Sequence, residues 1–311
     1  MDMSSIKYQC THKQDIKQKA AELGFAACGM AIAEAVDAEA EARYARWLSE
    51  GKNFCMDYAA RYTDVRSNPQ NLLLGAATVI SLALNYYPSS RQTDDALQIS
   101  YYAYGRDYHE VMRERMLRLA QYIHEQYQAE CRVCVDTAPI REKYWAQRAG
   151  IGFIGRNNLL ILPGRGSYFF LGEIVTTLSL EPDEPCRICC GDCHRCVDAC
   201  PGGALSHDGG AVDASRCLSC LLIEYRGEQL PDWAVKAKGN RLYGCDQCQK
   251  VCPHNSKAEP TQIEEFAPRK EILSLSPEQV RDMQQPQFSA LFSHSAIKRV
   301  KLAGLKRNLG D

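Results

Sequence analysis

Residues 190–201 read CGDCHRCVDACP, and this stretch decides the fold class of the 311-residue chain. Its cysteine spacing, with three residues and a proline around the fourth thiol, is typical of proteins that carry two [4Fe–4S] clusters. In such a run the first three thiolates bind one cluster, and the fourth reaches across to the other. A second run must therefore lie elsewhere in the chain.

The second run is CDQCQKVCP at residues 245–253, with Leu242 where its first cysteine would stand. One ligand must then come from the intervening segment, which offers Cys217 and Cys220. We favour Cys217 and keep Cys220 as the alternative. The predicted ligands are Cys190, Cys193, Cys196 and Cys252 for cluster 1, and Cys200, Cys217, Cys245 and Cys248 for cluster 2.

Other cysteine-rich sites fit the spacing less well. Disulfide frameworks suit short secreted chains, and zinc sites pair CxxC motifs without the CxxxCP ending. Cys186-x3-Cys190-x2-Cys193 also matches the spacing of radical S-adenosylmethionine enzymes, but here it is nested inside a ferredoxin run late in the chain. The two-cluster interpretation is therefore preferred.

Composition is that of an ordinary globular protein, with 45% hydrophobic residues, 24% charged residues and a net charge of −1. The first nine residues contain no apolar run, and no stretch of about eighteen apolar residues occurs, so we expect neither an export signal nor a membrane span. The many thiols predict a reducing compartment. We expect a cytoplasmic monomer without membrane contact.

The hydrophobic pattern divides the chain into three predicted regions. Helix is expected over residues 12–50 and 110–126, and strand over 78–84 and 133–135. This mixture indicates an α/β or α+β domain over 1–180. The acidic, proline-containing turn at 181–185 opens a cluster module over 181–260, and helical pieces at 276–283 and 288–300 belong to a segment over 261–311.

Two segments of the first region are candidates for a ligand site. Closely spaced glycines at 149–155, followed by Arg156, Asn157 and Asn158, would let the backbone approach a large flat ligand, although a tight turn explains them equally well. Asp136 follows the strand at 133–135 and precedes Pro139. It could donate a proton into a cleft or merely cap the next helix.

Several motifs together resemble one known family. They are YGRDYH at 104–109, DTAPI at 136–140, AGIG at 149–152, Arg156-Asn157, GSYF at 166–169 and LGE at 171–173, followed by both cysteine runs. The combination resembles epoxyqueuosine reductase over roughly residues 15–308.

The resemblance implies an α+β fold, with a nitroreductase-like cobalamin-binding sheet domain, a ferredoxin-like module for two clusters and a short helical C-terminal segment. It implies that the clusters pass electrons to base-off cobalamin, which reduces epoxyqueuosine to queuosine at the wobble position of tRNA. The resemblance assigns the acid beside the epoxide to Asp136. Its Arg-Cys-x-Ser pattern, matched at 216–219, supports Cys217 as the fourth ligand. The implied cobalamin contacts are Arg61, Asp136, Asn157, Tyr168, Ser219, Cys245 and Asp246.

The remaining expectations concern partners. The chain resembles a short form of the family, without the C-terminal HEAT-like repeats that help longer members hold tRNA. The basic residues near the end of the sequence, named below, are therefore our candidates for phosphate contacts to tRNA. A flavodoxin or ferredoxin system is the expected electron donor. A cobalamin reductase for another substrate, as in reductive dehalogenases, and a non-catalytic electron carrier remain alternatives. The basic cluster is Lys298, Arg299, Lys301, Lys306 and Arg307.

Overall fold

The computed structural model describes residues 3–209 and 211–310. Its central element is a four-stranded sheet in the order β1-β2-β7-β4, and every neighbouring pair is antiparallel. This pairing makes the fold α+β, one of the two classes that the pattern predicts. The strands are β1 (Ala27–Ile32), β2 (Thr78–Asn85), β4 (Cys131–Cys134) and β7 (Phe169–Thr176).

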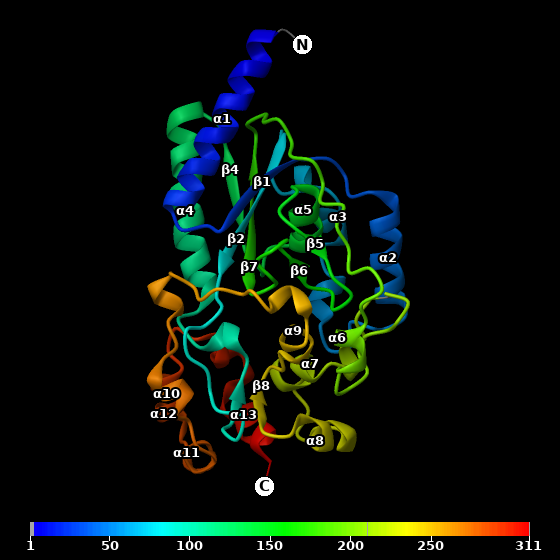
Figure 1. Cartoon of the computed structure of the whole chain (residues 1–311), viewed down its shortest axis with the longest axis vertical. Helices are drawn as coiled ribbons and strands as arrows, with labels where there is room; N and C mark the ends of the chain where they lie inside the picture. The colour runs from blue at the N-terminus through cyan, green and yellow to red at the C-terminus, as the bar shows by residue number, and fades with distance from the viewer. Residues whose placement is uncertain (1–2, 210, 311) are drawn as a thin grey trace.

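Helices cover both faces of this sheet (Figure 1). α1 (Met3–Glu22) and α4 (Tyr108–Tyr127) lie on one face, and α5 (Glu142–Arg148) packs on the other, with α2 (Ala38–Ser49) beyond it. α4 confirms the helix predicted over 110–126. The prediction of helix throughout 12–50 is wrong, because β1 separates α1 from α2 and pairs with β2.

Shorter elements surround the sheet domain. Two small sheets pair β3 (Gln98–Ile99) with β8 (Arg241–Tyr243), and β5 (Phe153–Ile154) with β6 (Leu160–Ile161). The other α-helices are α3 (Thr63–Ser67), α6 (Arg195–Asp198), α7 (Leu218–Ile223), α8 (Asp232–Lys238), α9 (Gln247–Lys250), α10 (Lys270–Leu273), α11 (Pro277–Asp282), α12 (Gln285–Leu291) and α13 (Lys301–Leu309). The 3₁₀ helices are η1 (Asp57–Ala60), η2 (Pro69–Asn71), η3 (Tyr101–Ala103), η4 (Ala214–Arg216), η5 (Pro253–Asn255), η6 (Glu264–Phe266) and η7 (Ala296–Val300).

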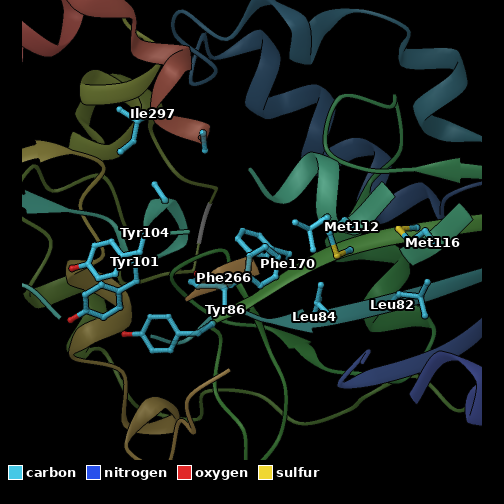
Figure 2. Close-up of a cluster of buried hydrophobic side chains, with 14 of the residues drawn as sticks. Leu82, Leu84, Tyr86, Tyr101, Tyr104, Met112, Met116, Phe170, Phe266 and Ile297 are labelled. Atoms are coloured by element: carbon cyan, nitrogen blue, oxygen red, sulfur yellow. The ribbon is translucent and has the colours of Figure 1, made fainter. Parts of the chain in front are cut away.

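The C-terminal segment completes the main core. α11 confirms the predicted helix at 276–283, whereas the piece predicted over 288–300 is split into α12 and η7 by a turn. Figure 2 shows Phe266 beside Phe170 of the sheet, and Ile297 belongs to the same buried cluster as Met112 of α4. Burial of each such side chain contributes roughly 1.5–3 kcal/mol. The segment is therefore bound to the sheet domain by apolar packing.

The cysteine-rich region is also bound to the sheet domain. β8 adds to β3 in parallel, and the tail of α13 contacts β8. Leu242 of β8 is fully buried, and its carbonyl accepts a hydrogen bond of 3.0 Å from the Asn308 side chain. Leu242, which stands where the first cysteine of the second run would be, is thus part of the core, and the ligand missing from that run must come from another residue.

Candidate functional site

A cleft of about 1220 Å³ lies where the three regions of the chain meet. Sheet-domain residues from Trp47 to Leu159, cysteine-region residues from Cys200 to Gln249, and C-terminal residues from Ser295 to Lys301 line it. Drug-sized ligands occupy pockets of roughly 300–1,000 Å³. The cleft is therefore large enough for a ligand bulkier than an ordinary small molecule.

The four predicted ligands of cluster 2, Cys200, Cys217, Cys245 and Cys248, all line this cleft. Burial raises the pKa of the Cys245 thiol to about 11, and the neighbouring Cys217 adds to the rise. Burial also raises the pKa of Cys248, with further contributions from Cys245, Cys217 and Cys200. The four thiols are thus close electrostatic neighbours in one place, although their role as ligands stays a prediction.

Cys220 has different neighbours. It is buried in α7, and its Sγ lies 3.8 Å from the Sγ of Cys55. Burial raises its pKa, and the nearby thiol of Cys55 is the next contribution. Cys217 instead precedes α7 as its N-cap and lies near Cys200. The geometry therefore groups Cys217 with the cluster thiols and Cys220 with Cys55.

The predicted ligands of cluster 1 gather around a second, smaller cavity, which they line together with Arg156, Asn157, Ile161, Pro253 and His254. Burial raises the pKa of Cys196, and the nearby thiols of Cys190 and Cys252 add to it. Arg156 donates to the Gly191 carbonyl, so it fastens the loop that carries the first run. The four thiols are Cys190, Cys193, Cys196 and Cys252.

Asp136 lies at the edge of the cleft, directly beyond β4. Its Oδ2 is 3.0 Å from Nε2 of His109, and its main-chain N–H donates to Oε1 of Glu142 at 2.6 Å. Its φ of +42° is left-handed, a conformation that costs on the order of 1 kcal/mol outside glycine. The N-cap of α5 is Arg141, so Asp136 does not cap that helix.

His109 is the residue that the sequence pattern did not assign, although it stood within the YGRDYH motif. Its Nδ1 lies 2.7 Å from Oδ1 of Asp107, and its Nε2 faces Asp136. Ionised carboxylates only accept hydrogen bonds, so both ring nitrogens must carry protons. Burial alone would lower the pKa of His109, but bonds to both carboxylates outweigh it and raise the pKa to about 9.

Asp136 is correspondingly acidic. Burial would raise the pKa of its carboxyl, but the hydrogen bond and charge of His109, with smaller contributions from Tyr108 and Arg299, lower it below the ordinary value. In this state the proton shared by the pair belongs to His109. Any proton that Asp136 delivers must therefore be replaced from the imidazolium.

This pair predicts a pH-dependent contribution to stability. A raised histidine pKa stabilises the fold fully below the unfolded value near 6.5, and the contribution disappears as pH rises through about 9. About one third of the His109 side chain is exposed, so solvent screening reduces this contribution. We expect the ion pair to add about 1–2 kcal/mol to the free energy of unfolding, which corresponds to roughly 2–6 °C in Tm. H109Q should lower Tm clearly at pH 6 and much less at pH 9.5, where most of the imidazolium charge has been lost. A difference that is constant across this range would contradict the ion pair.

The predicted cobalamin contacts divide into those that line the cleft and one that does not. Arg61, Asn157, Ser219, Cys245 and Asp246 line it, as does Asp136. The prediction for Tyr168 is wrong, because its side chain is 3% exposed within the aromatic core, where it packs edge-on against Tyr86. Tyr168 therefore supports the wall of the site from behind.

The glycines at 150–155 do not line the cleft, so the ligand role, one of the two that the sequence left open, gains no support. A Cβ at Gly152 would overlap the carbonyl of Ile161, and one at Gly150 would overlap the carbonyl of Glu184. They permit close packing within the protein. Asn157 does face the cleft, and its buried Nδ2 has no hydrogen-bond partner in the described structure. A buried unpaired donor is costly, so this amide fits a polar group of a ligand.

The basic cluster is only partly available for phosphate. Lys298, Arg299 and Lys301 line the cleft, although Arg299 is paired with both oxygens of Glu224. The prediction for Arg307 needs correction, because its guanidinium donates to the carbonyls of Leu221, Tyr225 and Gly227. Arg307 therefore holds α13 against the cysteine region.

Comparisons with known proteins match this architecture. The family model for epoxyqueuosine reductase QueG, DUF1730, matches residues 66–137, and that for a 4Fe-4S double cluster binding domain matches residues 189–255. An epoxyqueuosine reductase of Leadbetterella byssophila is 40% identical over 299 residues, covering 96% of this chain and 97% of its own. The Vibrio cholerae enzyme of that name is 38% identical, covering 94% and 80% respectively.

Solved structures agree with these relatives. The crystal structure of an epoxyqueuosine reductase with a tRNA-Tyr epoxyqueuosine-modified stem loop has a TM-score of 0.87 at 30% identity, covering 97% of this chain and 80% of that one. The Bacillus subtilis enzyme, with its catalytic aspartate loop swung out of the active site, has a TM-score of 0.85 with the same identity and coverage. The chain described here therefore belongs to the epoxyqueuosine reductase family of oxidoreductases.

Proposed function

We propose that the protein reduces epoxyqueuosine to queuosine in tRNA, with electrons supplied through two [4Fe–4S] clusters to cobalamin. The observation that carries this proposal is the shared cleft, which joins the cluster 2 thiols to the Asp136–His109 pair. A redox centre and a proton source must both be near the substrate for an epoxide to be reduced. Full-length similarity to epoxyqueuosine reductases supports the same assignment.

The reaction breaks both C–O bonds of the epoxide, forms a carbon–carbon double bond and releases water, so it consumes two electrons and two protons. Cobalamin held in the cleft would supply the two electrons, and clusters held by the two groups of thiols would supply electrons to it. The protein's own side chains must place the substrate and hold the protons. A positioned acid contributes typically 10²–10⁴-fold to such a step.

Several cleft residues fit a bulky, polar cofactor. The unpaired Asn157 amide is available to an acceptor on the ligand, and Arg61 and Ser219 present further donors to the same space. The Asp246 carboxylate already accepts the main-chain N–H of Tyr101 at 2.8 Å, so it fixes the wall beside Cys245. We infer that these residues hold cobalamin between cluster 2 and Asp136.

Asp136 and His109 are the proposed proton source. The His109 imidazolium donates to the Asp136 carboxylate, and the Tyr108 hydroxyl is a second hydrogen-bond neighbour of that carboxylate. The carboxylate lines the cleft, where it can face the leaving oxygen of the epoxide. When substrate excludes water, the aspartate becomes easier to protonate, because desolvation disfavours its charged form. His109 can then pass its proton to Asp136 for delivery to the substrate oxygen. Asp107 keeps the imidazole ring oriented throughout.

The outer parts of the proposal concern partners and organisation. Cluster 1 lies away from the cleft, so we infer that electrons from a flavodoxin or ferredoxin system enter there. Lys298, Lys301 and Lys306 remain the candidate phosphate contacts for tRNA. The divisions 1–180, 181–260 and 261–311, a monomeric state and a cytoplasmic location stay predictions. No helix in the described part of the chain is long and apolar enough to span a membrane.

The direct test is anaerobic reconstitution with iron, sulfide and cobalamin, followed by reduction and addition of tRNA that bears epoxyqueuosine. We expect nucleoside analysis by mass spectrometry to show loss of one oxygen and appearance of queuosine. The matched reaction without cobalamin should give none. Cluster-loaded protein that binds cobalamin yet leaves epoxyqueuosine unchanged would overturn the proposed function.

A further inference from the structure

Glu142 lies at the point where the loop that carries Asp136 meets α5. The loop leaves β4 at Cys134, and Glu142 is the first residue of α5. This helix is firmly packed, because Trp145 and Ala146 are buried against the sheet. A contact between Asp136 and Glu142 therefore fastens a loop residue to a rigid part of the fold.

That contact is made by the main chain of Asp136. The Asp136 N–H donates to Oε1 of Glu142 at 2.6 Å, and the Asp136 backbone is left-handed at φ +42°. This conformation is uncommon for residues other than glycine, although aspartate adopts it more readily than most, so a hydrogen bond that holds the loop helps to maintain it. The Asp136 carboxyl consequently points to His109, with Oδ2 and Nε2 3.0 Å apart. Without the Glu142 acceptor, nothing else described bonds this N–H.

The surroundings of Glu142 leave its carboxyl free for this purpose. Within 3–209 and 211–310, no lysine, arginine or histidine forms an ion pair with it, and the adjacent Lys143 donates to the Asn158 carbonyl instead. Burial raises the pKa of Glu142 to about 8, and Asp136 adds to the rise. A fully buried carboxyl, that of Glu173, lies behind it on β7. Glu142 therefore carries less negative charge near pH 7 than an ordinary glutamate, which lessens its repulsion of the Asp136 carboxylate.

We propose that Glu142 is a positioning residue, which latches the Asp136 loop by accepting its main-chain N–H and so holds the Asp136 carboxyl against His109 in the cleft. Its hydrogen bond goes to the backbone of Asp136, so it acts on position and transfers no proton to the carboxyl. The expected effect of Glu142 on the reaction rests on the proposed function. The hydrogen bond that holds the Asp136 loop does not depend on that function.

The activity test separates positioning from proton transfer. Glu142→Gln keeps a carbonyl acceptor in the same place, so we expect kcat within about threefold of wild type. Glu142→Ala removes the acceptor, and small misplacements of a catalytic group cost up to about 10²-fold, so we expect a fall of about 10- to 100-fold in kcat with KM for tRNA nearly unchanged. Should E142A not fold, E142D, with its acceptor one methylene shorter, takes its place.

A matched control comes from the carboxylate that contacts Arg141, the residue before Glu142. Glu41 binds Arg141 at 2.6 Å, so E41A also removes a carboxylate contact at the start of α5 but leaves the Asp136 N–H bonded. We expect E41A to retain wild-type kcat. Equal losses in E41A and E142A would show a general disturbance of α5 and would overturn the latch.

Hydrogen exchange gives a readout that needs no turnover. The peptide that contains the Asp136 amide should exchange at least about tenfold faster in E142A than in wild type, and at the wild-type rate in E142Q and E41A. Unchanged exchange in E142A, or an E142Q enzyme as slow as E142A, would refute the proposal. If wild-type protein does not reduce epoxyqueuosine, the proposed function fails, whereas the exchange result still decides the latch.

Discussion

Cys217→Ser is expected to leave the protein with one cluster and without reductase activity. Two [4Fe–4S] clusters correspond to about eight iron atoms per chain, and loss of one leaves about four. Cys217 lies with Cys200, Cys245 and Cys248 in the cleft, so the missing cluster should be the one nearest the substrate. Without it the electrons have no short path into the cleft. Iron and sulfide analysis with electron paramagnetic resonance of the reduced protein measures the loss.

Cys220→Ser is the matched control, since it removes a buried thiol only three residues away. The Cys220 Sγ faces Cys55 at 3.8 Å, so we expect both clusters and most of the activity to remain. C55S should behave in the same way. If C220S instead lost a cluster while C217S kept both, the ligand assignment would be reversed. That result would place the fourth thiolate inside α7.

The cysteine arrangement was predictable because iron–sulfur chemistry fixes the spacing of its ligands. A run such as 190–201 can fold around a cluster in few ways, so the spacing alone located both groups of thiols. The exception was the missing position of the second run. Spacing could not choose between Cys217 and Cys220, which lie on the same short segment. The resemblance favoured Cys217, and the different neighbours of the two thiols in space agree with that choice.

The cleft itself was only partly predictable. Asp136 could be placed at a strand end, but its partner His109 comes from the start of another helix, 27 residues earlier. Such a pairing depends on tertiary packing. The same limit applies to Tyr168, which the resemblance implied as a cobalamin contact, since only the packed structure shows that its side chain is buried in the aromatic core. The role of the glycines at 150 and 152 stayed open for a related reason, because close approach to a ligand and to a neighbouring carbonyl need the same residue.

Asp136→Asn is expected to have the largest effect on the chemical step. Asparagine has nearly the same shape and keeps the N–H to Glu142, but it cannot carry a proton to the epoxide oxygen. Loss of a positioned acid costs about 10²–10⁴-fold, so we expect kcat to fall by that factor while iron content and affinity for tRNA stay unchanged. D282N, at the end of α11, serves as the control for an aspartate outside the site.

The D136N enzyme should also change the behaviour of His109. With one carboxylate removed, less charge stabilises the imidazolium, so its pKa should fall from about 9 toward the ordinary value near 6.5. At pH 6, H109Q should therefore lower Tm less in the D136N protein than in the wild-type protein. The two effects are not additive because the two residues act through one hydrogen bond. The loss of rate in D136N is measured as single-turnover conversion by mass spectrometry.

A D136N protein that reduces epoxyqueuosine within a few fold of the wild-type rate would move the proton source to His109 or to another group in the cleft.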